Sequence, residues 1–227
     1  MKLTFYGHAC FGVLVGGKNI LFDPFIKYNE LAQHIDINSI AADYIFISHG
    51  HQDHMADAME IAQRTGATIV SNFEITSWFE SKGAGKTHPM NHGGKWKFDF
   101  GTVKYVNAVH SSSMPDGAYG GNPGGFVIET PDGTFYYSGD TALTLDMQLI
   151  PISSPALKFA LLPIGDNFTM GVDDAIIASD FIKCNRIIGL HYDTFGYIKI
   201  DHQQAIQKFA DKGKELILLE IGNSIDL

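Results

Sequence analysis

The stretch Tyr44-Ile-Phe-Ile-Ser-His-Gly-His-Gln-Asp-His54 joins a short apolar run to a dense group of metal-binding side chains. Four apolar or aromatic residues in a row are typical of a strand that is buried on both faces. After a single serine, the chain carries His49, His51, Asp53 and His54. Imidazole and carboxylate groups are the ligands of catalytic zinc and similar divalent ions. The stretch therefore predicts a buried strand that ends at half of a metal centre.

Three more candidate ligands lie close behind predicted strands elsewhere in the chain. His110 and His191 follow such strands directly, and Asp140 comes three residues after one. Loops at strand ends of a rigid scaffold are where active sites tend to collect. Taken alone, either histidine could be an ordinary loop residue, and Asp140 could equally cap a helix. In this order and with the first motif, metal ligation is the favoured interpretation.

The composition suits one globular domain spanning residues 1–227. The chain is 45% hydrophobic and 18% charged, which is enough apolar material for a substantial core. It has 25 Asp+Glu against 16 Lys+Arg, a formal net charge of −9. Because nucleic-acid affinity comes mostly from Lys and Arg on phosphates, we expect no nucleic-acid partner.

Neither a membrane partner nor a secretory route is expected. No apolar run approaches the roughly 20 residues that span a bilayer, and Met1–Phe5 leads directly into strand-like sequence. The two cysteines, Cys10 and Cys184, are not spaced as a zinc or redox pair, so buried free thiols are expected. The predicted location is the cytoplasm.

The first three strands are predicted to form an antiparallel meander. Lys2–Tyr6, Phe11–Val15 and Asn19–Asp23 are rich in strand-forming residues, and glycine-containing turns separate them. Alternate strands of a meander run the same way, so His8 and Asp23 should meet at one sheet edge. Asp23 either accepts the free N–H of a ligand histidine or orders the following turn. His8 either contacts substrate or stabilises a developing oxyanion, or it is a structural histidine.

Helices and strands alternate through the rest of the chain. We expect helices at Asp53–Thr65, Phe73–Ser81, Val172–Ile182 and His202–Ala210, and strands at Asp43–Ser48, Ala67–Ser71, Lys95–Phe100, Thr102–Val109, Gly125–Thr130, Thr134–Tyr137, Phe159–Leu162, Arg186–Leu190 and Leu216–Glu220. Asp57 should face water on the first helix, and residues 25–42 should be loop with some helix. The glycine-rich residues 111–124 form a long loop that is either a lid or a subunit contact.

The ordered set His49, His51, Asp53, His54, His110, Asp140 and His191 resembles the ligand set of the metallo-β-lactamase-fold hydrolases. Four further segments, Gly7–Phe11, Phe22–Phe25, Pro163–Met170 and His191–Phe195, are similar to a compact branch of metal-dependent hydrolases related to the ascorbate-6-phosphate lactonases. The resemblance covers nearly the whole chain. It implies an α/β fold, an αββα sandwich of two mixed β-sheets flanked by helices.

The resemblance also implies a role for each ligand. A first metal would be held by His49, His51 and His110, and a second by Asp53, His54 and His191, with Asp140 bridging the two. Direct catalytic roles fall to Asp53, His54 and Asp140. His51 stands where flavodiiron proteins carry glutamate, and Asp140 where the best-known lactamases carry cysteine, so redox chemistry and antibiotic hydrolysis are both disfavoured. The resemblance includes Asp166, Asn167 and Thr169, which would contact substrate or support ligands, unless they only form a turn and helix cap.

These expectations combine into a dinuclear metal-dependent hydrolase. Two divalent ions, zinc first and manganese, iron or nickel as alternatives, would share a water and lower its pKa from about 15.7 toward ~7. The metal-bound hydroxide would attack an ester, lactone or phosphodiester of a small molecule. Two dications, two carboxylates and one hydroxide leave a net charge of +1, which favours an anionic or polarised group.

Two alternatives have other functions on the same scaffold. An RNA-processing nuclease would use the same chemistry on a phosphodiester, but it needs a basic groove that the net charge of −9 does not favour. A non-catalytic metal-binding regulatory protein would be expected to have lost a ligand, and no ligand position is missing here. The oligomeric state does not follow from the sequence.

Overall fold

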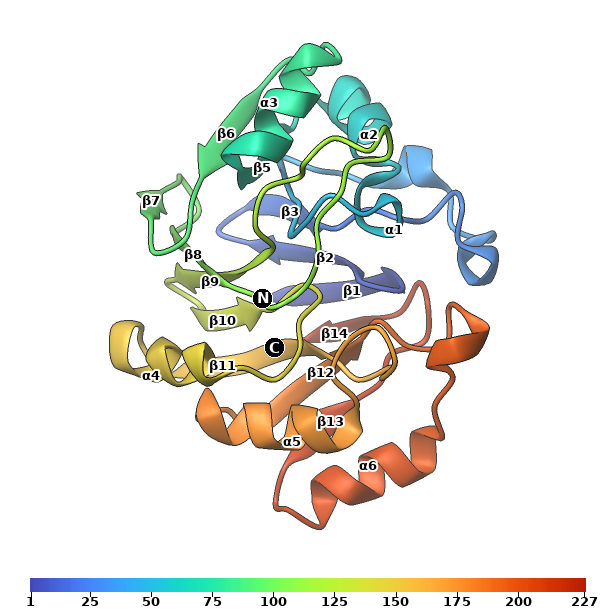
Figure 1. The fold of residues 1–227 in the computed structure, drawn as a ribbon, viewed down its shortest axis with the longest axis vertical. Helices are drawn as coiled ribbons and strands as arrows, with labels where there is room; N and C mark the ends of the chain where they lie inside the picture. The colour runs from blue at the N-terminus through green and yellow to red at the C-terminus, as the bar shows by residue number, and fades with distance from the viewer.

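Two seven-stranded sheets face each other in the computed structural model, which describes all 227 residues (Figure 1). The first sheet contains β1 (Lys2–Gly7), β2 (Cys10–Val15), β3 (Lys18–Phe22), β4 (Tyr44–Phe46), β5 (Thr68–Asn72), β6 (Thr87–Met90) and β14 (Ser224–Asp226). The second contains β7 (Lys95–Lys97), β8 (Thr102–Asn107), β9 (Gly124–Thr130), β10 (Gly133–Tyr137), β11 (Leu157–Pro163), β12 (Arg186–Leu190) and β13 (Glu215–Ile217). Both sheets are mixed, as expected from the resemblance.

Helices cover the outer faces of both sheets. The α-helices are α1 (Gln52–Met55), α2 (Ala58–Thr65), α3 (Phe73–Ser81), α4 (Ile150–Ser153), α5 (Val172–Phe181) and α6 (His202–Ala210), and the short 3-10 turns are η1 (Glu30–Ala32), η2 (Ile37–Ser39), η3 (Leu145–Leu149) and η4 (Gly196–Ile198). Helices α2 and α3 contact β5 of the first sheet, whereas α5 and α6 contact β11 and β13 of the second (Figure 1). The αββα sandwich is therefore confirmed. None of the helices combines the length and apolar character that crossing a bilayer requires.

The strand order explains how far-apart loops reach one place. The first sheet runs β14-β1-β2-β3-β4-β5-β6 and the second β13-β12-β11-β10-β9-β8-β7. The β1-β2-β3 meander is antiparallel as predicted, while β3 to β6 are parallel. In the second sheet, β10 to β13 are parallel. Parallel neighbours end at the same edge, so the loops after them gather there.

The strand β4 and its parallel neighbours are buried on both faces. Phe46 and Val70 point between the sheets and join the large central cluster of apolar residues. Their chain neighbours Ile45 and Ile69 point the other way, into a second cluster beneath α2 and α3. Because side chains alternate along a strand, a strand between two cores must be apolar at every position. This is the physical origin of the apolar run in the opening motif.

The helix predicted for Asp53–Thr65 is interrupted, and Asp57 causes the interruption. Asp57 is buried, contrary to the expectation that it faces water. Its Oδ2 accepts the backbone N–H groups of Ile26 at 2.5 Å and Lys27 at 3.0 Å, and its own N–H donates to the Pro24 carbonyl at 3.1 Å. The chain therefore ends α1, uses Asp57 to hold the 24–27 segment, and begins α2 afterwards.

Other differences from the predicted elements concern short strands. The strands β6 and β14 and the η3–α4 segment were not predicted, and β7 stops at Lys97 rather than Phe100. Strand β6 contains Pro89, which argues against a central strand, and it lies at a sheet edge where a missing N–H is tolerated. By contrast, the predicted bounds of α3, β12 and α6 agree with the structure.

Gly139 allows the two sheets to meet beneath the loops. It has φ +60°, and a Cβ at this position would overlap the side chain of Ser48 from the first sheet. The Ser48 carbonyl in turn accepts the N–H of Gly124 at 3.1 Å and the hydroxyl of Tyr105 at 3.2 Å. Absence of a side chain at Gly139 thus lets the chain after β10 lie against the chain after β4.

We expect Gly139→Ala to destabilise the protein more than Gly17→Ala. Both glycines have positive φ, +60° and +73°, but a Cβ at Gly17 meets nothing within 4 Å. Each alanine should lose about 1–2 kcal/mol from left-handed backbone strain, and Gly139→Ala a further ~1–3 kcal/mol from overlap. Urea unfolding of both variants measures the difference. Equal losses would show that the contact with Ser48 is not tight.

Candidate metal centre

The structure brings all seven candidate ligands to one place. His49 follows β4, His110 follows β8, Asp140 follows β10 and His191 follows β12, so each comes just after the end of a strand. These positions are far apart in the chain and meet because the parallel strands of both sheets end on the same side. Ligand distances divide them into two groups joined by Asp140.

The first group consists of His49, His51 and His110. The Nε2 of His49 lies 2.9 Å from the Nδ1 of His51. The ring of His110 is 5.0 Å from that of His49 and 5.1 Å from that of His51, both edge-on. One nitrogen from each of the three lies within 4.8 Å of the others, a spacing that one ion can fill. This is the first set implied by the resemblance.

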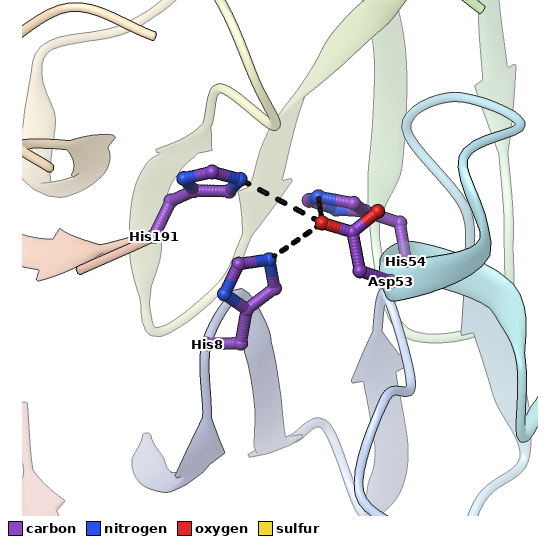
Figure 2. Close-up of side chains that lie close together, drawn as sticks. All are labelled: His8, Asp53, His54 and His191. Atoms are coloured by element: carbon purple, nitrogen blue, oxygen red, sulfur yellow. Dashed lines mark hydrogen bonds and ion pairs between the residues drawn. The ribbon is translucent and has the colours of Figure 1, made fainter. Parts of the chain in front are cut away.

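The second group surrounds the Oδ2 of Asp53 (Figure 2). The Nε2 atoms of His54 and His191 each lie 3.9 Å from this oxygen. Ligand atoms about 2.0–2.2 Å from a shared ion lie about 3–4 Å from one another. Figure 2 shows the three side chains, with His8, pointing toward a common centre. This is the second implied set, with His8 added.

Asp140 lies between the two groups. Its Oδ2 is 2.9 Å from the Nε2 of His191, 3.3 Å from that of His54 and 3.6 Å from that of His110. His110 belongs to the first group and the other two to the second. A carboxylate in this position can contribute to both ions at once.

Unsatisfied buried atoms fit a bound cation. The Nε2 of His54, the Oδ1 of Asp140 and the Nδ1 of His191 are buried and have no hydrogen-bond partner. Such atoms are rare in native proteins, because burial without a partner costs about 1–3 kcal/mol each. The Nε2 of His54 and the Oδ1 of Asp140 lie where the two groups meet, and a divalent ion there would take up their lone pairs. The Nδ1 of His191 does not count toward this, because it is the Nε2 of that ring that lies 2.9 Å from Asp140.

The pKa values of the cluster also favour positive charge there. Burial alone would raise the pKa of Asp140, but the neighbouring His191 and His54 hold it well below its usual range. Burial would lower the pKa of His54, but Asp140 and Asp53 outweigh it and raise that pKa well above the usual range. Without an ion, a proton on His54 balances the carboxylates. A divalent cation can replace that proton.

Asp23 forms hydrogen bonds with residues that support the cluster. Its Oδ2 accepts from the Nδ1 of His54 at 2.8 Å, the Ser48 hydroxyl at 2.5 Å and the Tyr137 hydroxyl at 2.7 Å. Its Oδ1 accepts the Ser48 N–H at 2.7 Å. Because His54 Nδ1 carries the proton toward Asp23, its Nε2 presents a lone pair to the site. Of the two roles predicted for Asp23, the hydrogen bond to His54 is the contact that support of a ligand histidine requires.

Ser48 extends the same network to the first group. Its hydroxyl lies 2.9 Å from the Nδ1 of His49, so the Nε2 of His49 is the nitrogen directed at His51. Ser48 and Tyr137 were not singled out from the sequence. The only available signal was their position next to a candidate ligand or at the end of a strand.

His8 lies behind Asp53, buried away from the pocket. Its Nε2 donates to the Oδ2 of Asp53 at 3.1 Å and its Nδ1 accepts from the Thr194 hydroxyl at 2.9 Å. Burial, together with nearby His191, lowers the pKa of His8 to about 4, so the ring is neutral. Both nitrogens are occupied, so His8 orients Asp53, and the expectation of substrate contact does not hold.

Strained backbone is concentrated at the site. His8, Asp23, His191 and Asp193 are non-glycine residues with φ between +39° and +63°. Such conformations cost of order 1–3 kcal/mol each and persist where surrounding contacts enforce them. One such contact is visible here, since the N–H of His191 donates to the carbonyl of His8 at 2.9 Å and ties the second sheet to the first.

Asp166, Asn167 and Thr169 do not reach the cluster. Asp166 and Asn167 have positive φ, and the Oδ1 of Asp166 accepts the N–H of Asn167 at 2.7 Å. The hydroxyl of Thr169 bonds the adjacent Met170 carbonyl. These side chains therefore form the turn, which was the alternative to substrate contact. It is Phe168, between them, that lines the pocket beside the cluster.

The long loop 111–124 is held against the first sheet. The hydroxyl of Ser112 accepts the N–H of Gly50 at 3.0 Å and donates to the Gly120 carbonyl at 2.8 Å. Met114 is buried in the cluster beneath α2 and α3, and Asp116 accepts from the indole of Trp78 at 2.8 Å. The loop thus runs from β8 toward α3 and back to β9 (Figure 1). It supports the turn between His49 and His51.

A pocket of about 970 Å³ opens above the cluster. His51, Asp53, His110, Asp140 and His191 form its floor. Asp53, whose side chain is 26% exposed, is the more accessible carboxylate, because Asp140 is only 2% exposed. Half of the remaining lining residues are aromatic, a feature that sequence patterns did not reveal because these aromatic residues come from three separate loops.

Comparisons with known proteins agree with this geometry. Residues 2–191 match the family model of the beta-lactamase superfamily domain. A protein of Flavobacterium johnsoniae described as a metal-dependent hydrolase is 63% identical over 227 residues, the whole of both chains. A solved metallo hydrolase from the archaeon Ignicoccus hospitalis is 34% identical, with a TM-score of 0.88 over 99% of this chain and 97% of that one. An isothiocyanate hydrolase from Delia radicum gut bacteria, 17% identical with a TM-score of 0.78 over 100% and 99% of the two chains, shares the fold.

We expect Asp23→Asn to weaken metal binding by about 10–100-fold. An amide cannot accept from all four donors that surround Asp23, because in either orientation its NH₂ group would face a donor, the Ser48 N–H or the donors around Oδ2 that include the His54 Nδ1–H. Competition with a chromogenic chelator measures the affinity. Asp132→Asn, an exposed site in the β9–β10 hairpin, is the control and should bind as the unaltered protein does. Unchanged affinity in Asp23→Asn would show that this carboxylate does not orient His54.

Proposed function

Because this chain belongs to the beta-lactamase superfamily and is a metal-dependent hydrolase, we propose that it binds two divalent ions and hydrolyses an ester, lactone or phosphodiester of a small molecule. The observation that carries the proposal is the position of Asp140. Its Oδ2 is within 3.6 Å of imidazole nitrogens from both ligand groups. A single-ion site would not need a carboxylate at that junction.

Each ligand keeps its implied role in this proposal. One ion is held by His49, His51 and His110, the other by Asp53, His54 and His191, with Asp140 shared. Zinc is the first choice for this imidazole-rich set, and manganese, iron or nickel are alternatives. Bound divalent ions would supply a hydroxide nucleophile near neutral pH and polarise the scissile bond.

The protein's own groups prepare the reaction. Asp23 keeps the Nδ1 of His54 protonated and His8 holds the Oδ2 of Asp53, so both ligands are oriented before substrate arrives. Asp53 is the ligand carboxylate that a bound substrate can reach, and Asp140 keeps the two ligand groups at a set spacing. These are the catalytic contributions we assign to Asp53, His54 and Asp140.

The pocket supports a small-molecule substrate rather than RNA. An RNA-processing enzyme needs basic side chains along the path of the strand, and no Lys or Arg lines the pocket. All ligand positions are filled, which disfavours a regulatory protein without activity. As part of the same proposal we place the protein in the cytoplasm, where its two buried free thiols would stay reduced.

We expect Asp140→Ala to abolish turnover and to lower bound metal from two equivalents to one or none. Removal of the shared carboxylate leaves both ligand groups with uncompensated charge. Elemental analysis gives the metal content, and Asp174→Ala, an exposed position on α5, is the control with normal content. Full activity in Asp140→Ala would rule out a shared role. If the unaltered protein bound well under one equivalent of metal even after metal was added, the proposed metal centre would be wrong.

A panel of lactones, thioesters, phosphomonoesters and phosphodiesters identifies the bond that is hydrolysed. The metal-loaded protein should hydrolyse at least one class, and the same activity should disappear in Asp140→Ala. Product formation is followed by pH-stat titration or chromatography. If none of the compounds is hydrolysed although two ions are bound, the alternative of a non-catalytic regulatory protein is favoured.

A further inference from the structure

Aromatic side chains from three separate loops surround the mouth of the metal pocket. Phe25 and Tyr28 follow β3, Phe168 follows β11, and Phe195 and Tyr197 follow β12. Tyr28 is 60% exposed, Phe168 49% and Tyr197 80%. Side chains as exposed as these contribute little to the core. Their gathering beside the ligands indicates a binding surface.

The rings form an inner and an outer pair. Phe25 and Phe195 lie edge-on to His8, with centroids 5.7 Å and 5.3 Å from its ring. His8 in turn bonds Asp53 (Figure 2), so the inner pair packs against a side chain that bonds this carboxylate. Phe168 and Tyr197, the more exposed pair, are edge-on with centroids 6.2 Å apart. A flat ring or short chain entering between the pairs would contact aromatic faces.

The same wall offers no partner for a negative charge. Apart from the ligands, Glu30 is the charged residue of the pocket, and no Lys or Arg lines it. The nearby Lys27 is held by Glu60 at 2.9 Å, and Lys199 lines a different hollow. Phosphate and carboxylate groups are recognised by Arg or Lys in most sites. The net charge of +1 counted for two dications, two carboxylates and one hydroxide therefore favours negative charge only on substrate atoms that contact the ions.

Resting on the proposed function, we propose that the substrate is an uncharged carboxylic ester or lactone whose aryl group lies among these aromatic side chains. In the reaction a bond forms from water oxygen to the acyl carbon, and the bond from that carbon to the alcohol oxygen breaks. The alcohol oxygen takes one proton, and the carboxylate product and a second proton leave to solvent. Phosphorylated molecules and esters with an anionic tail are poor substrates.

Two esters that differ in one group test the proposal with the metal-loaded protein. Benzyl acetate has an uncharged ring, and 4-carboxybenzyl acetate carries a carboxylate where the ring meets the outer wall. We expect kcat/KM to be at least about tenfold higher for benzyl acetate. Equal values, or preference for the carboxylate, would overturn the substrate class while leaving hydrolysis itself established.

Variants assign that preference to the wall. Tyr197→Ala and Phe168→Ala should each raise KM for benzyl acetate about three- to tenfold with little change in kcat. Glu30→Gln should lower the preference for the neutral ester about two- to threefold. Trp96→Ala, an exposed aromatic residue on β7, is the control. KM unchanged in both aromatic variants would overturn the role of the wall.

A binding measurement separates this proposal from the proposed function. N-benzylacetamide, the amide analogue of benzyl acetate, is titrated into the metal-loaded protein by calorimetry or ligand-observed NMR. If binding of N-benzylacetamide weakens in Tyr197→Ala, the aromatic site is supported even when no ester is hydrolysed. In that case only the assignment of an ester as the substrate is overturned. Absence of binding by N-benzylacetamide would overturn the aromatic site.

Discussion

The buried carboxylate of Asp23 is the interaction on which the site depends. It accepts from Ser48, His54 and Tyr137, which belong to the chain after β4, to α1 and to β10. One side chain thereby joins both sheets to a metal ligand. A buried anion is tolerable only when several donors surround it, and here the donors are the groups that must be positioned. The same hydrogen bonds therefore join the two sheets and orient His54, a candidate metal ligand.

The meeting of the two sheets has a steric condition as well. Gly139, with no side chain, lets the loop that carries Asp140 lie against Ser48, and the N–H of His191 reaches the carbonyl of His8. These contacts place carboxylate and imidazole groups within 4 Å of one another. The positive φ values at His8 and His191 are a cost that the surrounding sheets sustain.

Chemistry and specificity are separated in this pocket. The floor consists of the side chains proposed to hold the ions, and the wall includes aromatic residues from separate loops, of which Tyr28, Phe168 and Tyr197 are largely exposed. Such a division lets the bond-breaking machinery stay constant while the loops select the group attached to the bond. The predicted relation to the ascorbate-6-phosphate lactonases stays a prediction. No Lys or Arg lines the pocket to bind a phosphate, so the pocket gives that relation no support.

The sequence by itself predicted many of the strands and helices and the candidate ligands. The apolar run before His49, the hairpin turns and the helix of residues 202–210 are local patterns, and local patterns are readable from spacing alone. Grouping of the ligands by resemblance also agrees with the distances around Asp140. Only the tertiary structure decided that Asp57 is buried and that His8 contacts Asp53 rather than the pocket. It also decided that Phe168, and not Asp166, lines the pocket. These depend on contacts between segments remote in the chain, which no local pattern encodes.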